Sequence, residues 1–164
     1  LPSDTGPATV SDAWRIVEDD LSGAAIRALL EQHFAGMLAN SPAESCHFLD
    51  FDGLRAGDVT FWSIHRGEDL AGCGALKALG NCHGEIKSRR TADAFLRQGV
   101  AARMLVHIMG EARARGLERL SLETGSGPAF QPALALYARH GFEDCEPFAD
   151  YQPDPFSRFM TRAL

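Results

Sequence analysis

The sequence predicts an α+β fold of three layers, in which a mixed and mostly antiparallel sheet lies between helices. Short apolar runs with strand character follow one another, and segments with a helical apolar stripe stand between them. Turn signals such as Arg66-Gly67-Glu68-Asp69 and Gly80-Asn81 separate consecutive strands. At 164 residues the chain fits one domain that buries its own core.

The first elements are a strand at residues 14–18 and a helix at 26–38. In this helix the apolar side chains recur at i, i+3, i+4 and i+7, which places them on one face. Ser22 suits the N-terminal cap and Pro42 the stop. Residues 40–57 are rich in turn formers and predict a loop or short helix. The remaining elements follow as strands at 59–64, 70–79 and 83–91, a helix at 99–116, a strand at 117–124, a helix at 129–140, and strands at 142–148 and 157–162.

Composition limits the partners. The formal net charge of −6 argues against a nucleic-acid partner, which usually meets a basic face. No apolar run reaches the roughly 18 residues that span a bilayer, so we expect no membrane partner. Residues 1–12 are polar and rich in Gly, Pro and Ser, which predicts a flexible extension before a single domain at 13–164.

The four cysteines show no metal-binding pattern. None forms a CxxC pair, and no histidine pair stands at the spacing of a zinc site. We therefore expect free thiols, no bound metal and a cytoplasmic location, where thiols stay reduced. The cysteines are Cys46, Cys73, Cys82 and Cys145.

The most informative stretch is Leu96-Arg97-Gln98-Gly99-Val100-Ala101-Ala102, where a strand ends and a helix begins. The free N–H groups of a helix's first turn favour an anion. Gly99 lets a phosphate approach the backbone, and Ala101 and Ala102 leave the approach open. The stretch has the makings of a pyrophosphate cradle, although many ordinary helices also begin with Gly and Ala.

Two motifs in order and spacing resemble the GNAT superfamily of N-acetyltransferases. One is the pyrophosphate loop Arg/Gln-x-x-Gly-x-Gly/Ala, here residues 96–101, and the other is Ala-x-x-Leu-Tyr-x-x-x-Gly-Phe, here beginning at Ala133. The chain departs from the family at Leu96, where Arg or Gln is usual, and at Phe130, where many members have a cofactor-contacting Asn. Arg97 or Arg103 can supply the missing charge at the loop.

The resemblance implies an acetyl-CoA-dependent transfer to an amine of a small molecule or peptide, and a homodimer is common in this superfamily. It also implies that the strand before the cradle splays from its neighbour, so that its free backbone edge pairs with the pantetheine amides of CoA. The expected cofactor-binding residues are Arg89, Arg90, Thr91, Arg97, Gln98, Gly99, Val100, Ala101 and Ala102.

Tyr137 and Glu85 are the catalytic candidates. A phenol can protonate the departing CoA thiolate, and a carboxylate can take the proton that an amine must lose before attack. Glu85 holds a place similar to that of the general base in several histone-type relatives. His83 and His47 can instead act through a chain of waters. Ordinary packing of Tyr137 and a solvent-facing Glu85 are the plain alternatives.

The expected acceptor site lies on two loops. In the family, the loop after the first helix and the last hairpin frame the acceptor, which here indicates Glu44, His47, Asp150 and Tyr151. Glu44 and Asp150 suit a cationic amine. Arg89 and Arg90 can equally steer an anionic acceptor or a CoA phosphate.

Two other functions are alternatives to acetyl transfer. A catalytically silent CoA-binding sensor shares the cradle and differs only in turnover. A nucleotide-binding Rossmann or P-loop module needs Gly-x-Gly-x-x-Gly after the first strand or a Gly-Lys-Ser/Thr loop, and the sequence has neither.

Overall fold

A seven-stranded sheet forms the middle layer of the computed structural model, which describes residues 13–164. The strand order is β1-β2-β3-β4-β5-β7-β6, and only the β4–β5 pair is parallel. This confirms the mixed, mostly antiparallel sheet. The flexible extension expected at residues 1–12 lies outside the described residues. The strands are β1 (Trp14–Glu18), β2 (Val59–Arg66), β3 (Asp69–Gly80), β4 (His83–Thr91), β5 (Arg119–Gly125), β6 (Glu143–Asp144) and β7 (Ser157–Ala163).

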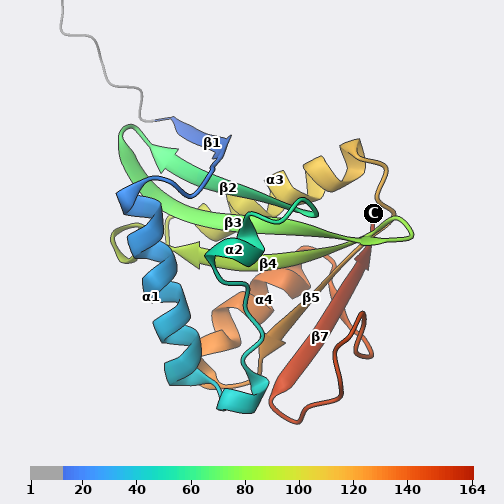
Figure 1. Cartoon of the computed structure of the whole chain (residues 1–164). Coiled ribbons are helices and arrows are strands. Elements are labelled where there is room, and N and C mark those ends of the chain that lie inside the picture. Colours follow the sequence, from blue (N-terminus) through green and yellow to red (C-terminus); the bar gives the residue numbers. More distant parts are fainter. Residues whose placement is uncertain (1–12) are drawn as a thin grey trace, which may run out of the picture.

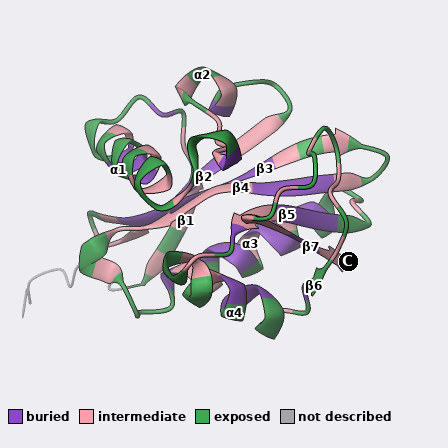
Figure 2. Cartoon of the chain, turned by 90° about the horizontal axis from the view of Figure 1, so that it is seen from below, coloured by how far each residue is buried: buried purple, intermediate pink, exposed green. Residues whose placement is uncertain are grey.

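Helices cover both faces of the sheet. α1 (Ala24–Asn40) and the short α2 (Phe51–Leu54) lie on one face, and α3 (Val100–Ala114) and α4 (Gln131–Arg139) lie on the other (Figures 1 and 2). The predicted three layers are therefore confirmed. Short 3-10 turns stand at Ala43–Ser45, Asp93–Phe95 and Pro128–Phe130. Among residues 13–164, no helix combines the length and the apolar content that crossing a membrane requires.

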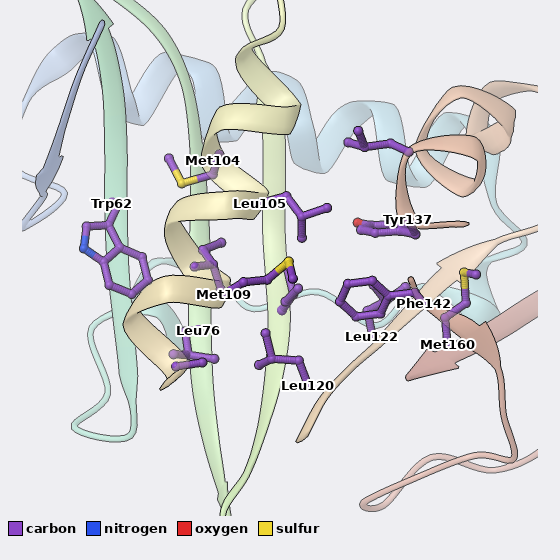
Figure 3. Packing of buried hydrophobic residues seen from close by; sticks show 14 of the residues in the cluster. Trp62, Leu76, Met104, Leu105, Met109, Leu120, Leu122, Tyr137, Phe142 and Met160 are labelled. Atoms are coloured by element: carbon purple, nitrogen blue, oxygen red, sulfur yellow. The ribbon is translucent and has the colours of Figure 1, made fainter. Parts of the chain in front are cut away.

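Each face of the sheet has its own apolar core. The larger core lies under α3 and α4, where Met104, Leu105 and Tyr137 belong to one buried cluster with the sheet residues Leu120 and Leu122 (Figure 3). The smaller core joins α1 and α2 to β2 and β3. Burial on both faces explains why β2 and β3 contain runs of consecutive buried residues instead of strict alternation.

Three sequence predictions need correction. The strand expected at 142–148 is only the two-residue β6, because Pro147 has no N–H to continue the ladder beyond the Cys145 N–H to Phe159 bond. Ser22 does not cap α1; its hydroxyl donates to Asp20, and Gly23 stands at the cap. The helix expected from residue 129 begins as a 3-10 turn, and α4 starts at Gln131 with Pro132 in its first turn.

Gly72 and Gly74 on β3 let neighbouring elements come close. A Cβ on Gly72 would lie 2.7 Å from the carbonyl oxygen of Arg90 and 2.9 Å from a methyl of Val100. A Cβ on Gly74 would meet the Met104 side chain at 2.7 Å. Gly72 therefore holds the end of β4 and the start of α3 against β3.

We expect Gly72→Ala to destabilise the fold by about 1–3 kcal/mol, because the backbone of Arg90 cannot give way as a flexible side chain can. The matched control is Gly110→Ala in α3, where a Cβ meets nothing within 4 Å and helix propensity favours Ala by about 1 kcal/mol. Urea unfolding midpoints measure both. Equal stability of the two variants would contradict the close approach at Gly72.

Candidate active site

The N-terminus of α3 is open in the way a phosphate cradle requires. Gly99 stands at the cap in the left-handed region with φ 81°, and no side chain caps the helix. The N–H groups of Val100, Ala101 and Ala102 have no acceptor within the helix. A Cβ on Gly99 would meet nothing within 4 Å, so the approach to these groups is clear.

A cavity of about 730 Å³ lies in front of this helix terminus. Its lining includes every predicted cofactor-binding residue except Gln98, whose side chain instead bonds to the Ala94 carbonyl and to Arg66. Arg97 lines the cavity, whereas the Arg103 guanidinium lies over the Trp14 ring at 5.2 Å from its centroid. Of the two arginines considered for replacing the charge lost at Leu96, Arg97 is therefore the one at the cavity. Arg139 of α4 also lines it.

The strand β4 leaves its neighbour β5 after three residues. The parallel pairing covers only His83–Glu85 against Arg119–Ser121, and in the part of the chain that the structure describes β4 then continues to Thr91 without a partner on that side. The predicted splay is confirmed. Ser88 has φ 54°, and the β3–β4 register shifts between Cys73 and Ala75. The second half of β4 therefore offers free backbone groups to an extended ligand.

An inner cavity of about 240 Å³ occupies the gap between the two strands, and Tyr137 and Glu85 both line it. The Tyr137 ring is buried beside Phe142 (Figure 3). Its hydroxyl makes no hydrogen bond with any residue in 13–164. The Arg89 guanidinium lies 4.6 Å from the centroid of that ring, and its Nε and Nη1 are buried without a partner among residues 13–164. An unpaired cation here favours a negative charge beside the phenol.

Glu85 belongs to a compact polar network. Its carboxylate accepts hydrogen bonds from the Tyr151 hydroxyl at 2.5 Å and from Lys87 Nζ at 3.1 Å, and Lys87 also donates to the Tyr151 oxygen at 2.9 Å. Glu85 is 3% exposed, so the plain alternative of a solvent-facing strand residue does not apply. Burial, and then the negative charge of Glu85, raise the pKa of Tyr151, which keeps the phenol protonated.

A second carboxylate, Glu123 on β5, faces the same inner cavity. It pairs with Nδ1 of His47 and accepts from the Ser157 hydroxyl at 3.4 Å. Burial raises the pKa of Glu123, although the neighbouring His47 opposes this. A buried carboxyl whose pKa is moved upward is a better proton acceptor near neutral pH.

The two loops expected to frame the acceptor meet each other. Ser45 donates to Asp154 at 2.5 Å, and the rings of His47 and Tyr151 lie edge to face at 5.4 Å. These loops border an outer cavity of about 1160 Å³, which all four predicted acceptor residues line: Glu44, His47, Asp150 and Tyr151. His47 and Tyr151 line the inner cavity as well, so the two cavities share a wall.

Sequence reasoning missed Lys87, Glu123 and Arg139. Lys87 stands two residues after Glu85 on a strand, a spacing that places both on one face and was available as a signal. Glu123 reaches the site only because β5 diverges from β4, and no local pattern reveals that. His83 bonds to the Ser121 hydroxyl at 2.6 Å and lines the outer cavity only.

These features define a class of protein. An uncapped helix terminus beside a free strand edge can hold a pyrophosphate and an amide-bearing arm, and the adjoining cavity carries a phenol and two carboxylates. This combination suits an acyltransferase that uses a CoA thioester.

Comparison with known proteins agrees. Residues 14–142 match the Acetyltransferase (GNAT) family, and the chain belongs to it. The chain is 54% identical over 146 residues to the uncharacterized N-acetyltransferase YsnE of Bacillus subtilis (strain 168), covering 89% of this chain and 97% of that protein. It is also 54% identical over 151 residues to the uncharacterized N-acetyltransferase YedL of Escherichia coli (strain K12), covering 92% and 95%.

Among solved structures, a Bacillus subtilis acetyltransferase in complex with CoA superposes with a TM-score of 0.70 at 16% identity, covering 93% of this chain and 99% of that one. At this identity the likeness concerns the fold. The chain is an N-acetyltransferase, which favours the enzyme over the silent CoA-binding sensor.

His33 of α1 lines the inner cavity and gives the site a pH-dependent stability. Burial, and then the charge of Arg90, lower the pKa of His33 to about 4. The unfolded chain therefore takes up this proton at a higher pH than the folded protein does. The contribution of His33 to the free energy of unfolding is fully present above about pH 6.5, and about 3 kcal/mol of it is lost as the pH drops to 4.

His33→Gln should remove this part of the slope, since glutamine does not titrate. Urea unfolding of both proteins at several pH values between 4 and 7 measures the difference between the slopes, so that other titrating groups cancel. Identical slopes would contradict the neutral, buried state of His33.

Proposed function

We propose that this enzyme transfers an acetyl group from acetyl-CoA to the amine of a small molecule by direct attack. The observation that carries the proposal is the parting of β4 from β5 in front of the uncapped α3 terminus. This gap connects the cavity in front of α3, which suits CoA, to the inner cavity, which holds the phenol and carboxylates that amine acylation requires. The two cavities share four lining residues: Arg89, Arg90, Ala129 and Ala133.

The first turn of α3 is proposed to bind the pyrophosphate through the N–H groups of Val100, Ala101 and Ala102. Arg97 adds positive charge at the same end of the cavity. The free edge of β4 around Arg89–Thr91 is proposed to pair with the amides of the pantetheine arm, which directs the thioester toward Tyr137. The acceptor then enters from the outer cavity, between the loops that carry Glu44, His47 and Asp150.

The buried carboxylates Glu85 and Glu123 are proposed to accept the proton that the incoming ammonium group must lose. An amine with its usual pKa is protonated at neutral pH and cannot attack until it loses that proton. Its nitrogen then bonds to the acetyl carbon, the carbon–sulfur bond breaks, and the new amide nitrogen releases its remaining extra proton to solvent. Tyr137 gives its hydroxyl proton to the departing thiolate, and solvent restores it.

Binding of acetyl-CoA at the α3 terminus should raise the melting temperature. At a concentration about 100 times the dissociation constant, the stabilisation is about 2.7 kcal/mol. Gly99→Glu should abolish the rise, because bulk and negative charge then face the phosphates. The matched control is Gly110→Glu, which adds the same charge to the exposed face of the same helix. A rise of normal size in Gly99→Glu would place the phosphates elsewhere.

Tyr137→Phe should lower kcat by about 10²–10⁴-fold and leave acetyl-CoA affinity nearly unchanged, because the proton is needed only as sulfur gains charge. Single-turnover rates are the measurement, since slow product release can hide the chemical step. The melting temperature should hardly move, because the hydroxyl has no hydrogen bond to lose within 13–164.

Tyr151→Phe is the comparison variant. It removes the other phenol of the chain but leaves the thiolate side intact, so acceptor KM and the pH profile should change more than the single-turnover rate at saturation. If Tyr137→Phe transfers acetyl at the normal rate, the Tyr137 ring serves packing only.

A further inference from the structure

Arg90 presents an unpaired guanidinium on the acceptor side of the sheet. It lines the inner cavity, and a Cβ on Gly36 of α1 would lie 3.1 Å from its Nη1. The guanidinium makes no ion pair or hydrogen bond with the residues that the structure describes. A glycine inside a helix costs about 1 kcal/mol relative to alanine, so its presence at 36 fits a need to admit this side chain.

Both carboxylates of the inner cavity are already paired with other cations. Lys87 pairs with Glu85, and His47 pairs with Glu123. Arg89 lies over the Tyr137 ring on the opposite face of the sheet, toward α4. Apart from the histidines, the cavity lining holds two carboxylates and three cations: Glu85 and Glu123 against Lys87, Arg89 and Arg90.

The residues that α1 contributes to this cavity include no anion that could pair with Arg90. They are His33, Gly36, Met37 and Asn40. His33 is neutral near pH 7 because burial lowers its pKa to about 4. The Arg90 guanidinium therefore has donors available to a ligand in the cavity. A planar guanidinium can bind a carboxylate through two parallel hydrogen bonds.

We propose that Arg90 binds a carboxylate carried by the acceptor, so that the acceptor is a small amino acid or a similar molecule with both an amine and a carboxylate. This inference rests on the proposed acetyl transfer. The cavity of about 240 Å³ is below the roughly 300–1,000 Å³ of sites for drug-sized ligands, which suits such a molecule. The amine then lies toward Glu85 and Glu123, and the carboxylate toward α1.

Matched acceptors test the proposal. Acetyl transfer at saturating acetyl-CoA is measured for several α-amino acids and for their uncharged carboxamides. In the wild type we expect kcat/KM to favour the acid by roughly 10–100-fold, the range for a hydrogen bond to a charged group. Arg90→Met should bring the acid-to-amide ratio close to that of the free amines, and Arg90→Lys should keep part of the preference because it keeps the charge.

The ratio between wild type and variant cancels intrinsic differences in amine reactivity. A second arm needs no turnover: an N-acetyl amino acid should raise the melting temperature of the wild type but not of Arg90→Met. Gly36→Asp gives an independent variant, because its carboxylate occupies Arg90 without removing it, and the acid preference should again be lost. The melting-temperature rise with acetyl-CoA shows that each variant is folded.

Three results overturn the proposal. One is an acid-to-amide ratio that Arg90→Met leaves unchanged. Another is a loss of acetyl-CoA affinity in Arg90→Met with a normal acid preference, which would make Arg90 a phosphate ligand. The third is unaltered acid preference in Gly36→Asp. If neither the amino acids nor their carboxamides are acetylated, the proposed function fails instead. The Arg90 site is then supported if the N-acetyl amino acid raises the melting temperature of the wild type but not of Arg90→Met, and contradicted otherwise.

Discussion

The site depends on the early end of the pairing between β4 and β5. Only three residues of each strand pair, from His83–Glu85 and Arg119–Ser121, and β5 then follows β7 along its whole length. A strand edge inside a sheet normally has a partner, because unpaired N–H and C=O groups away from water are costly. The free half of β4 therefore has backbone N–H and C=O groups that an extended, amide-bearing ligand can pair with. The gap between the two strands also forms the inner cavity.

Large aromatic side chains pack at the β5 side of the gap. The Phe130 ring lies against Gly125, where a Cβ would come within 2.5 Å of it, and it packs edge to face with Phe156. Phe130 is the position at which the chain departs from the family's cofactor-contacting Asn. An apolar ring here gives up a polar contact but fixes the β5 end and closes one wall of the cavity. The departure thus affects the shape of the site, whereas the backbone cradle at Gly99 is independent of it.

Much of the fold was predictable because it rests on local patterns. Strands, helices and the cradle follow from periodicity and from Gly99, and the order of the elements gave the layers. The wrong predictions depended on single interactions. The strand at 142–148 ends early because Pro147 lacks a backbone donor, and Ser22 does not cap α1 because its hydroxyl bonds to Asp20. Those parts of the site that belong to short sequence motifs were predictable. The hydrogen bonds of Tyr151 with Glu85 and Lys87, and the contact of Glu123 with His47, join residues 64 or more positions apart, and no short spacing encodes such contacts.

The two adjacent arginines show most clearly what a linear pattern leaves open. As letters, Arg89 and Arg90 are equivalent, and both suited either a phosphate or an anionic acceptor. Alternation along β4 sends them to opposite faces: Arg89 stacks on Tyr137 in α4, and Arg90 lies against Gly36 in α1. A net charge of −6 gives no hint of this positive pair. Because the field that a ligand meets in a narrow cavity is set by the nearest unpaired charges, the local surplus outweighs the overall sign. In the reaction we propose, Arg89 then faces the departing thiolate and Arg90 faces the acceptor.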